Sequence, residues 1–171
     1  MPLTSSIVPY DESWPLKFEE EVRRLKPVFV GHLLRLEHVG STAVKGLAAK
    51  PEIDILVIVS DTTLLEQWSL ELETLDYVRG KDLQPGHHFF KWDVVGIRTH
   101  KLHICQDAHP QIRRMILIRN HLRENASDLA EYENLKLNLE QENKSGIKEY
   151  LDGKAPFLDA LFKKITEGSV S

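Results

Sequence analysis

Residues 38–59 read HVGSTAVKGLAAKPEIDILVIV, and this stretch decides the fold. Its second half, residues 52–59, is rich in β-branched residues and almost continuously apolar, which predicts a central strand covered on both faces. Because successive side chains of a strand alternate, Glu52 and Asp54 point the same way and Ile53 points the opposite way. The stretch therefore predicts a short strand, a tight glycine-containing loop and a second strand whose first residues present an acid pair, Glu52 and Asp54.

The acid pair and the small-residue turn before it suit the same chemistry. Two adjacent carboxylates repel each other unless a cation lies between them, and their hard oxygens suit Mg²⁺ bound to substrate phosphates. Gly40 permits a close approach of the backbone, and Ser41 offers a hydroxyl and an N–H to a phosphate oxygen. The plain alternative is that the acids lie at a solvated strand end and that the Gly-Ser turn is an ordinary turn. Each feature taken separately favours this alternative.

The rest of the chain reads as one domain, 1–171, of mixed helices and strands. Helical spacing of apolar residues covers residues 13–26, 62–75, 110–124, 128–142 and 155–166. Strand character covers residues 34–39, 76–80, 87–92 and 98–105. The last three strands suggest an antiparallel meander added to the central strand. We expect an α/β (α+β) fold with a mixed, mostly antiparallel sheet flanked by helices, a helical C-terminal part and a polar tail at 168–171.

Composition and charge exclude several classes of protein. A length of 171 residues suits one domain, and a formal charge of −4 argues against non-specific binding of duplex nucleic acid. The first residues, MPLTSSIVPYDESWP, lack the pattern of a signal peptide, and no apolar run approaches the roughly 20 residues of a membrane span. The lone Cys105 fits a reducing compartment. We expect a cytoplasmic protein that uses neither a membrane nor duplex nucleic acid, and the oligomeric state stays open.

The Gly-Ser turn followed by an acid-apolar-acid-apolar run is similar to the signature of the nucleotidyltransferase superfamily of polymerase-β-like folds. More narrowly, residues 38–44, 46–51 and 53–55 resemble the opening motif of the GrpB family. Later positions resemble further GrpB blocks: Pro85, Gly86, His87, Phe89, Phe90, Arg98, Thr99, His100, Leu102, His103, Arg119, Leu122, Arg123, Tyr132, Leu135 and Lys136. The resemblance spans residues 7–165 and implies a nucleotidyltransferase-like fold.

The resemblance also implies roles for individual residues. In catalytic members of the superfamily the acid pair binds Mg²⁺, the Gly-Ser turn holds the nucleotide triphosphate, and a third acid on a neighbouring strand completes the metal site. Carried over, Glu52 and Asp54 become metal ligands and, with His103, catalytic residues. The implied contacts to substrate or phosphate are His38, Gly40, Ser41, Thr42, Lys50, Arg98, His100, Arg119, Arg123 and Lys136.

One feature of the sequence qualifies this carry-over, and another supports it. The neighbouring strand offers Arg98, His100, Lys101 and His103 in place of a third acid, so either a histidine serves as ligand or base, or full metal catalysis is absent. Residues 98–124 hold six basic and two acidic side chains, a local charge of +4 that suits a polyphosphate.

Two functions remain open. The leading interpretation is Mg²⁺-dependent nucleotide binding, with transfer of a nucleotidyl group to a small acceptor as its extension. The alternative is a non-catalytic module of the same fold that binds a nucleotide, another anion or a protein partner. The expected partner is a nucleotide or other phosphorylated small molecule. Whether Lys50 faces the phosphates or Glu52 stays open as well.

Overall fold

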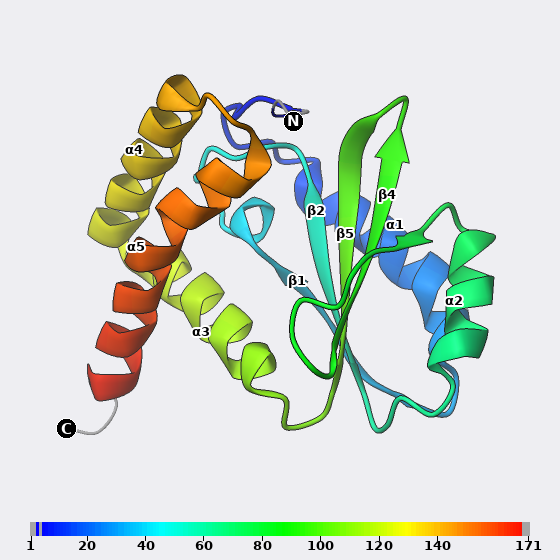
Figure 1. Ribbon diagram of the computed structural model, residues 1–171. Coiled ribbons are helices and arrows are strands. Elements are labelled where there is room, and N and C mark those ends of the chain that lie inside the picture. The colour runs from blue at the N-terminus through cyan, green and yellow to red at the C-terminus, as the bar shows by residue number, and fades with distance from the viewer. Residues whose placement is uncertain (1–2, 4, 169–171) are drawn as a thin grey trace.

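The computed structural model describes residue 3 and residues 5–168, and its centre is a five-stranded sheet (Figure 1). In sheet order the strands are β1 (Leu33–Val39), β2 (Ile53–Val59), β5 (Ile97–Gln106), β4 (His87–Val94) and β3 (Val78–Arg79). Only the β2–β5 pair among them is parallel; the other three pairs are antiparallel. The sheet is mixed and mostly antiparallel, which confirms the predicted fold class.

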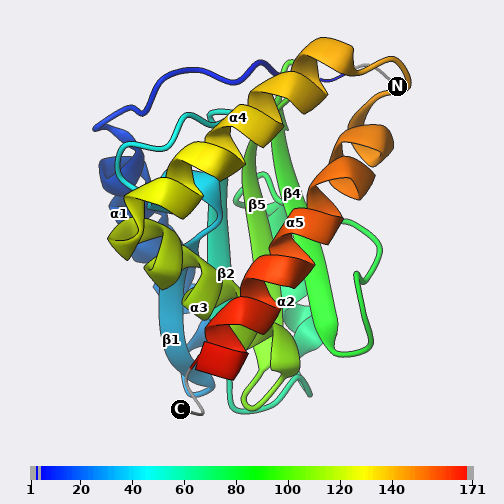
Figure 2. The ribbon, with the colours of Figure 1, turned by 90° about the vertical axis from the view of Figure 1, so that its left-hand side faces the viewer.

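Helices cover both faces of the sheet (Figures 1 and 2). They are α1 (Trp14–Leu25) and α2 (Leu65–Glu73) on one face, and α3 (Pro110–Glu124), α4 (Ala126–Glu142) and α5 (Ile147–Gly168) on the other. Short 3₁₀ helices at Lys26–Phe29 and Ser41–Ala43 follow α1 and β1. Within the described residues, none of these helices has the length and apolar character needed to cross a bilayer.

β2 is buried on both faces, as the apolar run predicts. Ile55 packs in the core with Trp14 of α1, whereas Leu56 points the other way and packs with Met115 of α3. Alternation then carries Asp54 to the side of Leu56, toward α3, α4 and α5. The pattern of β2 therefore decides which layer of helices faces the acid pair.

α5 begins at Ile147, eight residues before the predicted start at residue 155. Gly153 and Pro156 disfavour helix interiors, so the local sequence pattern does not predict the first two turns of α5. In the structure a Cβ at residue 153 would lie 2.5 Å from Leu139 Cδ2, so glycine lets α5 pack closely on α4. Packing thus outweighs the local helix propensity.

Other boundaries differ by smaller amounts. α2 is shorter than predicted because Asp61 accepts a hydrogen bond from the Thr63 N–H in a turn that precedes the helix. Pairing between β1 and β2 shifts register between Leu33 and Arg35, which leaves Leu34 exposed instead of alternating inward. Of the predicted tail, Gly168 ends α5, and residues 169–171 lie outside the described part of the chain.

Candidate functional site

A cavity of about 390 Å³ lies between the sheet and the helices α3, α4 and α5. On the sheet side its walls come from the turn after β1, from the start of β2 and from β5. The sheet-side residues are Val39, Gly40, Ser41, Thr42, Lys50, Glu52, Asp54, Lys101 and His103. Both acids thus face one cavity, as their spacing predicts.

The Gly-Ser turn is packed directly on the acid pair. Gly40 has φ +75°, and a Cβ added there would lie 2.5 Å from Asp54 Oδ2, so only glycine fits. Thr42 Oγ1 donates a hydrogen bond to the Glu52 carbonyl at 3.1 Å. The close approach predicted at Gly40 therefore brings the backbone to the chain's own Asp54.

The acid pair is bridged by a lysine from β5. Lys101 Nζ lies 3.1 Å from Glu52 Oε2 and 3.5 Å from Asp54 Oδ1. Parallel pairing of β2 with β5 sets Lys101 beside Asp54. Burial alone would raise the pKa of Asp54, but Lys101 and a hydrogen bond from His103 lower it to about 2. The same carboxylates raise the pKa of Lys101 despite its burial.

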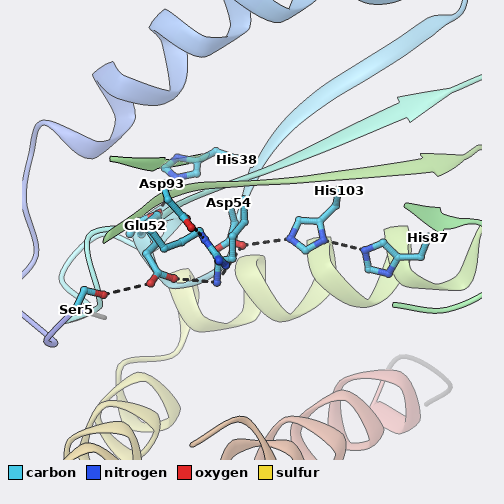
Figure 3. A network of polar contacts seen from close by, with 10 residues as sticks. Ser5, His38, Glu52, Asp54, His87, Asp93 and His103 are labelled. Carbon is cyan, nitrogen blue, oxygen red and sulfur yellow. Dashed lines mark hydrogen bonds and ion pairs between the residues drawn. The ribbon is translucent and has the colours of Figure 1, made fainter. Parts of the chain in front are cut away.

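Asp54 also ends a chain of two histidines (Figure 3). His103 Nε2 lies 3.2 Å from Asp54 Oδ1, and His103 Nδ1 lies 2.8 Å from His87 Nε2. Because Asp54 is ionised, His103 Nε2–H donates to it, and His103 Nδ1 and His87 Nε2 share one hydrogen between them. Burial and the neighbouring histidines lower the pKa of His87 to about 4, so it is neutral at pH 7. His87 lies at a position that resembles a GrpB block, but its contact with His103 depends on the register of β4 with β5.

Three lysines line the cavity around two tyrosines; we call Lys50, Lys136 and Lys154 the lysine cluster. Lys50 Nζ lies 4.1 Å and Lys154 Nζ 4.9 Å from the Tyr150 ring centroid. Lys136 is 2% exposed and donates a hydrogen bond to the Ala48 carbonyl at 2.6 Å. Burial, reinforced by Lys154, lowers the pKa of Lys136 to about 7. Lys50 thus faces the cavity.

The arginine Arg119 lines the cavity, but its guanidinium is already engaged by β1. It donates to Glu37 Oε2 at 2.7 Å and to the His38 carbonyl at 2.9 Å. Arg114, which the sequence did not single out as a site residue, lines the cavity while it pairs with Asp159 at 2.7 Å. Both arginines hold the walls together in this arrangement.

His38 lies behind the turn, outside the cavity lining. Its ring stacks on Phe18 of α1, and its Nε2 lies 3.0 Å from Thr42 Oγ1. Because the Thr42 hydroxyl donates to Glu52, it accepts from His38, so His38 supports the turn. Burial lowers the pKa of His38 to about 4.

Three more predicted substrate contacts also lie outside the cavity lining. His100 stacks on Trp92 at 4.6 Å on the opposite face of the sheet, because it alternates with the cavity-facing Lys101 and His103. Arg98 pairs with Asp93 between β5 and β4. Arg123 donates to the Ala43 carbonyl at 2.9 Å, one turn of α3 beyond Arg119. The structure does not bring His38, Arg98, His100 and Arg123 together with the acid pair in the cavity.

The residues present do not fit a resident Mg²⁺. Within residues 3 and 5–168 no group of three or more acidic, histidine or cysteine side chains is placed to hold a metal ion. The ammonium of Lys101 takes the place between Glu52 and Asp54 where a cation would bind, and it would repel a divalent ion there. The donor set therefore suits an internal ion pair.

Known proteins share both the sequence and the fold. The family model described as GrpB protein matches residues 4–164. A UPF0157 protein of Halalkalibacterium halodurans is 34% identical over 162 residues, 93% of this chain and 81% of that protein. The solved structure of conserved protein GrpB from Enterococcus faecalis matches with TM-score 0.89 and 33% identity, over 97% of this chain and 100% of that one.

A more distant likeness shows the fold alone. The Cid1 poly(U) polymerase with Mg 3′-dATP bound matches with TM-score 0.57 at 14% identity, over 86% of this chain and 49% of that one. This chain thus shares the fold of that part of the polymerase. Because the family pattern covers residues 4–164 and the related protein and structure match over most of their own length, this chain belongs to the GrpB family.

Proposed function

We propose that the cavity binds a phosphorylated small molecule, with a nucleotide as the first candidate. The observation that carries this proposal is the lysine cluster, three lysine side chains on the wall of one cavity. Burial and neighbouring positive charge lower the pKa of Lys50 and Lys136, so the free protein pays for bringing these groups together. A bound phosphate would offset that cost with charge-assisted hydrogen bonds.

The remaining wall supports a ligand with an apolar or aromatic body. α5 contributes Ile147, Leu151 and Leu158, and the exposed fractions of Ile147 and Leu151 are 45% and 48%. Tyr132 and Tyr150 add aromatic surface beside the lysines. A nucleoside phosphate has this combination, since its base can stack on apolar and aromatic side chains while its phosphates meet ammonium groups.

Nucleotidyl transfer with Mg²⁺ is the second candidate function. The acid pair beside the Gly40–Ser41 turn favours it, on a fold that this chain shares with a poly(U) polymerase. Lys101 would have to leave the acid pair before a metal could bind there. Because Lys101 already pairs with both acids, we rank ligand binding ahead of nucleotidyl transfer.

Calorimetric titration of the full chain with ATP, GTP, CTP, UTP and inorganic triphosphate tests the binding proposal. We expect binding by at least one probe, and a Kd at least tenfold higher for Lys154→Gln because a charge-assisted contact is lost. Lys163→Gln, on the same helix but 74% exposed at its side chain, is the control and should bind as the unaltered chain does. Failure of the folded protein to bind any probe would refute the proposal.

The second candidate has its own readout. Pyrophosphate release from a nucleoside triphosphate in the presence of Mg²⁺ and trial acceptors should be measured for the unaltered chain and for Asp54→Asn. Pyrophosphate release that requires the acceptor and disappears in folded Asp54→Asn would establish transfer. Binding without turnover agrees with the first proposal.

A further inference from the structure

The Lys101 side chain lies between Glu52 and Asp54, and strand pairing fixes its position. Parallel pairing sets Lys101 directly beside Asp54, and alternation points it into the same cavity. The Lys101 side chain is 28% exposed, and those of Glu52 and Asp54 are 12% and 15% exposed. An ion pair at this depth is weakly screened by salt, so breaking it to admit another cation is costly.

Two other donors also contact the same acids. Ser5 Oγ donates to Glu52 Oε1 at 3.2 Å, and His103 Nε2 donates to Asp54 Oδ1 at 3.2 Å (Figure 3). Asp54 Oδ2 faces the backbone at Gly40. A metal at the acid pair would have to compete with an ammonium, a hydroxyl and an imidazole.

The charges divide the cavity into two parts. Lys101, Glu52 and Asp54 together carry a net charge of −1, which disfavours phosphate, whereas the lysine cluster that lines the same cavity carries up to +3. The lysine cluster comes from the segment before β2 and from α4 and α5. Phosphate oxygens are therefore favoured at the lysine cluster and disfavoured at the acid pair.

We propose that Lys101 acts as an internal cation in place of a divalent metal, so that the site binds its phosphorylated ligand at the lysine cluster without Mg²⁺. This inference rests on the proposed function, because it specifies how the same cavity meets phosphate. It also specifies the ionic form of the ligand: the metal-free phosphate binds, and its Mg²⁺ complex binds no better.

The first test compares ATP and inorganic triphosphate in EDTA with the same probes in excess Mg²⁺, by calorimetry on the full chain. Under the inference, Mg²⁺ leaves the Kd unchanged or raises it, because it neutralises the charge that the lysines recognise. A Kd that falls tenfold or more with Mg²⁺ would overturn the inference while leaving the proposed function intact. If neither probe binds under either condition, the proposed function fails, and the second test decides on Lys101.

The second test uses Mn²⁺ alone, detected by electron paramagnetic resonance, and needs no phosphorylated ligand. The unaltered chain should show no Mn²⁺ site that depends on Asp54, whereas Lys101→Glu places a third carboxylate beside the pair and should create one. Lys163→Met, an exposed lysine of α5, is the control and should behave as the unaltered chain. A Mn²⁺ site in the unaltered chain that disappears in Asp54→Asn would overturn the inference, even if Lys101→Glu fails to fold.

Discussion

Asp54 is the residue on which the sheet side of the cavity converges. Its carboxylate pairs with Lys101, accepts a hydrogen bond from His103 and lies against the Gly40 backbone. These contacts favour the ionised form and set its pKa to about 2 in the folded protein. Protonation in acid should therefore loosen the site before it affects the apolar core.

The pH dependence of stability gives the first prediction. The pKa of Asp54 in the folded protein lies below the usual value of 3.8. Its ionised carboxylate therefore contributes fully to the free energy of unfolding above pH 4, and this contribution is lost as the pH falls toward 2. Urea denaturation measures the free energy of unfolding. On acidification this free energy should fall by roughly 2 kcal/mol less in Asp54→Asn than in the unaltered chain. Asp152→Asn, which alters an exposed pair with Lys148, is the control. Identical acid profiles for the chain and Asp54→Asn would contradict the assignment.

Lys136 gives a prediction of proton uptake on binding. Its pKa of about 7 lies below the usual value, so at pH 8 it is mostly neutral in the free protein. A bound phosphate would favour the ammonium, and roughly 0.5–1 proton should be taken up per ligand. Calorimetry with ATP in Tris and in HEPES at pH 8 measures this uptake from the buffer dependence of the enthalpy. Lys136→Met should bind with little buffer dependence; equal dependence in both proteins would exclude Lys136 as the source.

At the residue scale, the sequence predicts contacts within a strand better than contacts between strands. Alternation correctly places Glu52 and Asp54 on one side and separates His100 from His103. It cannot predict that Lys101 bridges the acids, because the register of β2 with β5 depends on the folded sheet.

At the scale of elements, the turn between β1 and β2 is the most constrained segment of the site. Gly40 and Gly46 both have positive φ, but a Cβ would meet Asp54 only at Gly40 and would find no atom within 4 Å at Gly46. Gly40→Ala should therefore lower the free energy of unfolding by about 2–4 kcal/mol, from backbone strain plus the clash. Gly46→Ala should cost about 1 kcal/mol from backbone strain alone. Chemical denaturation of the two variants measures the difference, and equal losses would show that the turn does not press on Asp54.

Element boundaries follow the sequence where local pattern and packing agree. α3 and β2 end within a residue or so of their predictions because capping, proline and apolar runs coincide there. α5 departs because Gly153 and Pro156 disfavour a helix locally, whereas Tyr150 and Leu161 bury its face. Lys154 was missed for the same reason, since it lies in the part of α5 that the local pattern excluded.

For the whole molecule, the cavity lies between two layers that polar contacts, such as those of Arg119 with Glu37 and of Lys136 with the Ala48 carbonyl, join around it. Its walls come from the sheet and from α3, α4 and α5. A ligand that contacts both Lys50 and Lys154 would therefore tie the start of β2 to α5. Binding should rigidify the connection between α4 and α5, at residues 143–146.

Thermal unfolding and limited proteolysis together test this prediction. A ligand at 100 times its Kd adds about 2.7 kcal/mol, which should raise Tm by about 5–10 °C in a chain of this size. Cleavage within residues 143–146 should slow in parallel. A higher Tm with unchanged cleavage there would place the ligand away from α5.

The single parallel strand pair also has a consequence for how the protein folds. β1 with β2, and β3 with β4 and β5, are antiparallel sets of sequence neighbours, whereas Asp54 meets Lys101 only where the two sets join. Strands that are far apart in the sequence pair slowly, because the entropy cost of closing the loop between them comes before their contacts can stabilise the pair. In a stopped-flow refolding experiment, recovery of ligand binding should therefore lag behind recovery of the far-ultraviolet circular dichroism signal. A newly made chain would acquire most of its secondary structure first and its binding competence last.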